Sequence, residues 1–164
     1  MFLKELFDYK SRLMQDVCTN TDIVKLITGK PYKPGQERTL PYSQVFPYEF
    51  VPETVDNGQT FLCFDVDISR VPNKTFYSPV IYIWVFTHKS KMRLDEGGVR
   101  VDELAIKIDE MLNGNRFYGL GELDLQDVGR FAPITDYQGR VLVYTAKDFN
   151  RGQGKQMPAN RKQN

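Results

Sequence analysis

The chain has 164 residues, and its 22 Lys and Arg nearly balance its 21 Asp and Glu, which leaves a formal net charge of +1. This length fits one domain with a core of its own, and the near-neutral charge argues against a general nucleic-acid-binding protein. No apolar run reaches the roughly 18 residues that a membrane span needs. The N-terminal residues lack the apolar stretch and cleavage site of a signal peptide, so we expect a protein made in the cytoplasm, with no membrane partner.

Two helices are predicted at the start of the chain. Apolar residues recur at helical spacing through residues 3–17, with charged residues between them. Asn20 or Thr21 can then cap a short second helix, and Gly29 is a natural stop for it. After a loop over residues 30–42, rich in proline, the segment 45–53 reads as an edge strand or covering arm.

A pair of strands is expected next. In residues 60–68 every second position from Leu62 onward is apolar, and the positions between them hold both apolar and acidic residues, which predicts a strand. Residues 69–74 form a turn into a second strand over residues 77–88, so the two strands are predicted to form a hairpin. The second strand is apolar on both faces, with Val80, Tyr82, Trp84 and Phe86 on one and Ile81, Ile83 and Val85 on the other. One helix layer covers one face only. The other face is expected to pack under the N-terminal helix or against a neighbouring copy.

The C-terminal half adds one helix and two strands. Residues 101–112 form the clearest helical stripe, residues 121–126 alternate as a strand, and residues 137–146 combine a turn with a final strand. The element order predicts an α+β fold: a single mostly antiparallel sheet with a helix layer, N-terminal helices and an extended C-terminal tail. We expect the domain to span residues 1–148.

The last residues, 149–164, form a separate basic arm. They have no periodicity and few apolar side chains, so they cannot fold alone. Residues 147–164 sum to +4, which leaves −3 for the rest of the chain. The expected contact residues lie on this arm and on the polar loop over residues 88–98. They are Lys89, Lys91, Arg93, Arg151, Lys155, Arg161 and Lys162.

Few residues suggest chemistry. His88 is the only histidine, so neither a catalytic triad nor a histidine-rich metal site is expected, and Cys18 and Cys63 read as buried thiols. One alternative is a small metal-dependent nuclease in which Asp65 and Asp67 share a strand face and Glu103, with Lys107, lies nearby. The favoured expectation is a protein that is not an enzyme and that holds no metal and no cofactor.

Three stretches carry a family resemblance: NTDIVKLITGKPY, VFPYEFVPETVDNGQTFLCFDVDI and GGVRVDELAIKIDEMLNG. Together with the strand pair and the two closing strands, they resemble the tail terminator and head–tail joining proteins of tailed bacteriophages. The resemblance covers residues 1–148 and rests on element order and texture. The long basic arm departs from that pattern, which leaves another neck or head-completion protein of similar fold as an alternative.

The resemblance implies a structural virion protein without enzymatic activity. Its copies would form a ring, by analogy a hexamer, at the neck between head and tail, after assembly in the bacterial cytoplasm. The implied partners are the tail tube protein on one side and the head-side neck or connector proteins on the other, with DNA passing through the lumen. A ring subunit needs two adhesive sides, which an apolar sheet face and extended arms would supply.

Overall fold

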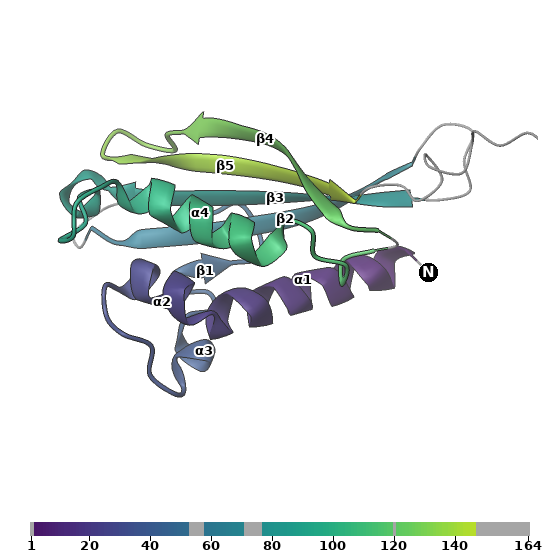
Figure 1. The fold of residues 1–164 in the computed structure, drawn as a ribbon, viewed down its shortest axis with the longest axis horizontal. Coiled ribbons are helices and arrows are strands. Elements are labelled where there is room, and N and C mark those ends of the chain that lie inside the picture. Colours follow the sequence, from purple (N-terminus) through teal and green to yellow (C-terminus); the bar gives the residue numbers. More distant parts are fainter. Residues whose placement is uncertain (1, 53–57, 71–76, 120, 147–164) are drawn as a thin grey trace, which may run out of the picture.

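One mixed five-stranded sheet organises the molecule. The computed structural model describes residues 2–52, 58–70, 77–119 and 121–146, and the strands lie in the order β1-β2-β3-β5-β4 (Figure 1). Their bounds are β1 Val45–Phe46, β2 Thr60–Arg70, β3 Tyr77–His88, β4 Leu123–Phe131 and β5 Tyr137–Ala146. β1 pairs with β2 in parallel, and the remaining pairs are antiparallel. The α+β class and the mostly antiparallel sheet are therefore confirmed.

The helices gather on one face of this sheet. Their bounds are α1 Phe2–Thr19, α2 Thr21–Thr28, α3 Gln36–Thr39, the 3-10 turn η1 Lys89–Lys91 and α4 Arg100–Leu112. The apolar sides of α1, α2 and α4 bury against the same side chains of β2, β3 and β5, which include Phe64, Ile81, Ile83, Leu142 and Tyr144. None of the described helices is long and apolar enough to cross a membrane.

Local sequence signals explain the short helix α2. The side chain of Asn20 accepts a hydrogen bond from the Ile23 amide at 3.1 Å, which satisfies one of the free donors of the first turn. Gly29 ends the helix at φ 72°, in the left-handed region that glycine adopts without strain. Both boundaries agree with the sequence prediction.

Arg100 joins three segments of the helix layer. Its guanidinium donates to the Leu26 carbonyl at the end of α2, at 2.8 Å, and to the Lys91 carbonyl, at 2.7 Å. α4 is thereby tied both to α2 and to the loop that follows β3. The hairpin of β2 and β3 has the predicted antiparallel pairing, with Thr60 opposite Thr87.

Three segments differ from the sequence prediction. The proline-rich loop contains the four-residue helix α3, and the arm that begins at Val45 supplies a strand of only two residues. β4 extends to Phe131, five residues beyond the predicted end, because a bulge between Leu125 and Asp127 interrupts the alternation but not the pairing with β5. Since a bulge changes which side chains share a face, the prediction from strict period-two alternation ended the strand too early.

The position of α1 tests one of the two covers expected for the second face of β3, namely the N-terminal helix. α1 packs on the same face as α2 and α4, where Leu13 and Val17 enter the main core. The expectation that the N-terminal helix could cover the second face is therefore wrong. An amphipathic helix buries one stripe only, and the stripe of α1 completes the layer that α2 and α4 also form.

Candidate functional site

The candidate site is the sheet face that carries none of these helices, here called the open face. It consists of the strand side chains that point away from the main core, since side chains along a strand point alternately to the two faces of the sheet. Across the four long strands they lie in three cross-strand rows: Asp67–Val80–Thr145–Asp124, Asp65–Tyr82–Val143–Asp127 and Cys63–Trp84–Val141–Gly129. Val80, Tyr82, Trp84, Val141 and Val143 are half-buried, and the rings of Tyr82 and Trp84 stack at 5.9 Å. The open face is thus an apolar strip with water access.

One end of the second sheet face is closed by the chain itself. Phe46 and Phe50 from the arm after α3 stack at 4.0 Å, and both rings lie against Phe61. Phe86, Tyr137 and Phe131 continue this aromatic cluster toward β4. The prediction of a covering arm therefore holds at this end for its described residues, 45–52. The arm also covers Cys63 at the edge of the third row, where the buried thiol donates to the Phe50 carbonyl at 3.9 Å, whereas the first two rows keep water access.

Carboxylates frame the open face on both flanks. In the first two rows the outer positions on β2 and β4 are all aspartates, whereas the rows contain no Lys or Arg. Asp67 and Asp127 are exposed, and no ion pair forms to either of them among the described residues. Asp65 is half-buried and pairs with Lys10 of α1 at 2.6 Å, while the same ammonium group donates to the Pro47 carbonyl at 3.1 Å.

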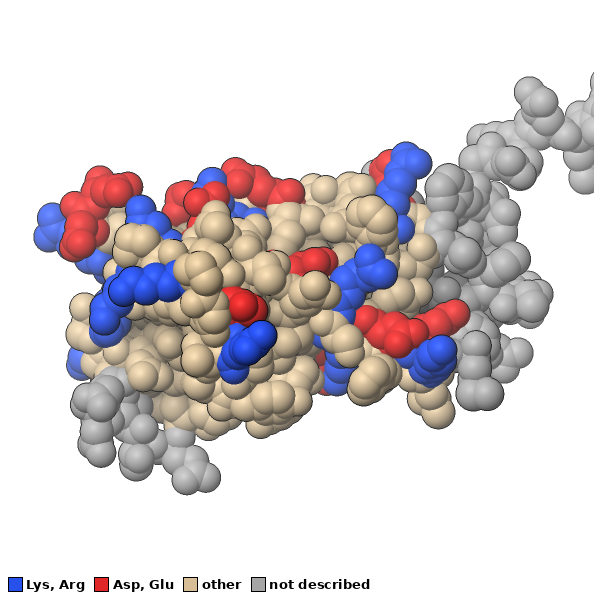
Figure 2. All heavy atoms as spheres, turned by 90° about the horizontal axis from the view of Figure 1, so that it is seen from below, with Lys and Arg blue, Asp and Glu red and all other residues tan. Residues whose placement is uncertain are grey.

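The side of the molecule opposite the open face has a different character. Figure 2 views the molecule from the side of α1, and charged side chains of both signs lie along its upper margin, over the helix layer. The two sides therefore offer different surfaces, one polar and mixed in charge, the other apolar with an acidic frame.

The sequence prediction named neither Asp124 nor Asp127 of this frame, and of the two only Asp127 falls outside the predicted strand. It lies after the bulge, beyond the predicted end of the strand, and faces Val143 in the pairing of β4 with β5. The available signal was the β-branched Val128 and the aromatic Phe131, two residue types that favour strands and that lie past Gln126.

The nuclease hypothesis required Asp65, Asp67 and Glu103 to meet, and the fold separates them. The two aspartates belong to the open face, whereas Glu103 lies on α4, which packs on the other face of the sheet. Lys107 pairs with Glu110 at 3.0 Å and does not reach the aspartates. Among the described residues no cluster of three or more His, Cys, Asp or Glu side chains could hold a metal ion. The prediction that these residues lie close together was wrong, because the period-two spacing of a strand does not reveal which face of the sheet a distant helix covers.

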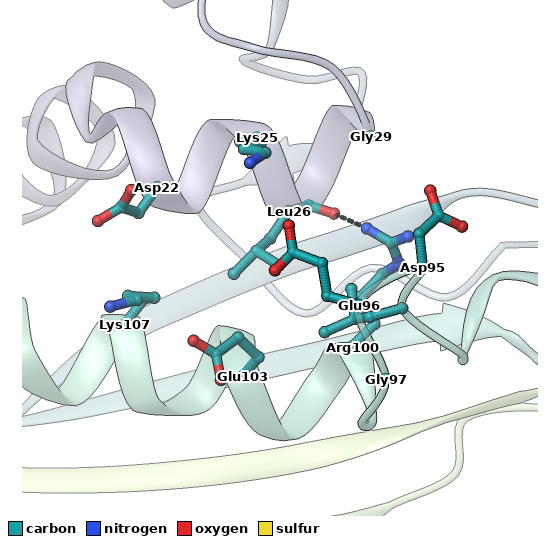
Figure 3. Close-up of a pocket in the computed structure, with 11 residues that line it drawn as sticks. Asp22, Lys25, Leu26, Gly29, Asp95, Glu96, Gly97, Arg100, Glu103 and Lys107 are labelled. Carbon is teal, nitrogen blue, oxygen red and sulfur yellow. Dashed lines mark hydrogen bonds between the residues drawn. The ribbon is translucent and has the colours of Figure 1, made fainter.

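A groove of about 450 Å³ lies between α2 and α4 (Figure 3). Its charged side chains are of both signs, four acidic and three basic: Asp22, Lys25, Asp95, Glu96, Arg100, Glu103 and Lys107. Arg100 is already bonded to the backbone at its base. A groove whose charges nearly balance one another attracts neither an anion nor a cation strongly, and we assign no ligand to it.

The predicted contact residues fall into two groups. Lys89, Lys91 and Arg93 are exposed on the loop that begins with η1, at the end of β3, and Lys89 pairs with Asp136 at 3.0 Å. This pair lowers the pKa of the Asp136 carboxyl, first through the hydrogen bond from Lys89. Arg151, Lys155, Arg161 and Lys162 lie outside the described residues.

Comparison with known proteins gives a family match. The YomW family model matches residues 20–146, which includes every strand and every helix after α1. This family is associated with bacteriophages. No curated protein matches the chain.

Proposed function

This chain belongs to the phage-associated YomW family, and from that premise we propose that it is a structural protein of the phage particle. The observation that carries the proposal is the open face. Apolar side chains with water access on a sheet are typical of surfaces that bind another protein, and among the described residues no group of three or more His, Cys, Asp or Glu could hold a metal ion. The chain would act by packing rather than by chemistry.

The finer proposal is a ring at the joint between head and tail. A closed ring requires each copy to present two different surfaces to its neighbours, and this subunit has an apolar open face and a charged helix side. We place the ring on the tail tube, with the head-side connector proteins above it and DNA passing through its lumen. Six copies are expected from the likeness to tail terminators, and Lys89, Lys91 and Arg93 would contact a neighbouring protein.

The test is removal of the gene from a phage that encodes the chain. Particles made without the protein should accumulate as separate filled heads and tails, and the chain supplied in trans should restore joined particles. Electron microscopy of the particles counts the joined fraction, and cryo-electron microscopy of complete particles shows whether the chain forms a ring on the tail axis.

Three results would contradict the proposed ring. Normal joined particles without the protein, its absence from purified particles, or a position away from the tail axis would each exclude the ring at the head–tail joint. A ring on the head side of the joint would instead identify a head-completion protein. DNA cleavage by the purified chain with Mg²⁺ would contradict a role without chemistry.

A further inference from the structure

We propose that the open face is the receptor for the basic C-terminal arm, residues 149–164, of a neighbouring copy. This inference rests on the proposed function because it names what joins one subunit of the assembly to the next. It begins with the charge pattern of the face. Two of its rows end in aspartates on both sides, and the central positions are Val80, Tyr82, Val143 and Thr145.

The dimensions of this surface suit an extended peptide. Strands lie about 4.8 Å apart, so the four strands of a row separate the flanking aspartates by roughly 14 Å. A single extended segment laid on the central strands places its apolar side chains on the strip and reaches the carboxylates with long cationic side chains. A flat apolar partner would instead desolvate the carboxylates and offer no cation to Asp67 or Asp127, with which no described residue forms an ion pair.

The arm has the matching composition. It contains four cations, Arg151, Lys155, Arg161 and Lys162, and no acidic residue, together with the apolar Phe149 and Met157. The carboxylates and cations attract each other at long range, and contact between the apolar groups then excludes water. The charges of the arm and of the face are therefore complementary, although both belong to one chain.

The direction of β5 favours a neighbouring copy over the same copy. β5 ends at Ala146, at the end of the sheet where the aspartate rows lie, and its arrow points away from the centre of the molecule (Figure 1). Sixteen residues in extended form reach up to about 53 Å, which is enough to span an adjacent subunit. The arm of each copy can thus bind the open face of the next, which is the repeated one-directional contact that a ring needs.

The binding test uses the only tryptophan, Trp84, which lies on the open face. The arm of a full-length chain is made acidic by four substitutions, R151E, K155E, R161E and K162E. The aspartates of the open face repel this arm, so the face stays available for an added peptide. A synthetic peptide with the natural sequence of residues 147–164 is then titrated in while the emission of Trp84 is recorded. We expect a saturable change of that emission that weakens as salt is raised.

Charge reversal on the face identifies the receptor. Asp67→Lys and Asp127→Lys are placed in a chain with the natural arm, which the reversed face repels, and should weaken binding of the natural peptide by about tenfold or more, because several attractions become repulsions. A peptide with the four arm substitutions should recover binding to that chain. The matched control places Asp95→Lys with Glu96→Lys in the chain with the reversed arm, makes the same change of net charge on the helix side and should leave the affinity unchanged. The proposal is overturned by a peptide titration without a saturable change of Trp84 emission, or by control substitutions that weaken peptide binding equally.

Cross-linking decides which copy supplies the arm. Chains with Met157→Cys are mixed with chains with Tyr82→Cys and treated with a short thiol cross-linker. A cross-linked dimer that is absent with Ile106→Cys, an exposed control on α4, supports binding between copies. A cross-link that forms only when both cysteines are in one chain, or a dimer of equal yield with the control, overturns it. These measurements use purified chain and test only the binding of the arm, whereas the particle test concerns the ring at the joint. The arm proposal can therefore fail while the ring proposal succeeds, and the ring proposal can fail while the arm proposal succeeds.

Discussion

At the scale of single residues, the two cysteines illustrate how burial controls reactivity. Cys18 packs among the helices and Cys63 belongs to the aromatic cluster on the other face, so they lie on opposite sides of the sheet and remain free thiols. Burial raises the pKa of Cys18 to about 11 and that of Cys63 to about 12. The interpretation of both as buried apolar residues is confirmed.

Alkylation follows from these pKa values. Only the thiolate reacts, and a raised pKa makes the thiolate scarce below that pKa, so at mildly alkaline pH about one Cys18 side chain in a thousand is ionised and still fewer of Cys63. We therefore expect no labelling by iodoacetamide in the folded chain within an hour and complete labelling of both in denaturant. Mass spectrometry measures the added mass. Rapid labelling of either cysteine in the folded chain would contradict the burial.

At the scale of elements, the pairing of β3 with β5 depends on a glycine. Gly139 lies opposite Phe86, and a Cβ atom at this position would lie 1.7 Å from the Val85 carbonyl oxygen and 2.6 Å from the Phe86 Cα. Both are backbone atoms of the central strand, which cannot move aside as the end of a side chain can. Only glycine allows the two strands to approach this closely.

Gly139→Ala should accordingly destabilise the fold by at least about 2 kcal/mol, because overpacking forces the backbone of β3 and β5 apart. The neighbouring Gln138 is exposed, so Gln138→Ala is the matched control and should change stability by less than about 0.5 kcal/mol. Urea unfolding followed by circular dichroism measures both variants. Equal midpoints for the two would show that the strands tolerate the extra carbon.

At the scale of the whole molecule, the described residues form a layered fold. The helix layer, the sheet and the aromatic cluster hold the core from Leu13 to Tyr144. The arm, residues 149–164, remains the element that we assign to assembly. Folding and assembly should therefore respond separately to its removal.

Deletion of residues 150–164 tests this separation. The shortened chain should keep its circular dichroism spectrum and melt within a few degrees of the full chain, while a phage that encodes it should yield separate heads and tails. Differential scanning calorimetry and electron microscopy are the two readouts. A shortened chain that unfolds would place the arm in the core, and normal infectious particles would show that the arm has no role in joining.

Local sequence signals determined much of this fold because they act within a few residues. The capping side chain of Asn20, the left-handed Gly29, the alternating pattern of β2 and the apolar runs of β3 and β5 each specify an element from its own residues. The same patterns identified the apolar second face of β3. The basic composition of residues 149–164 is likewise a property of the sequence alone.

Tertiary structure decided everything that depends on which distant segments meet. Only packing shows that α1 joins α2 and α4 on one face, which separates Glu103 from Asp65 and leaves the open face uncovered by helices. Only strand register, changed by the bulge before Asp127, places aspartates of β2 and β4 on the two flanks of one apolar strip. The physical reason is that hydrophobic burial rewards contact between any two apolar surfaces, whereas the choice between them depends on the register and layering of the whole chain.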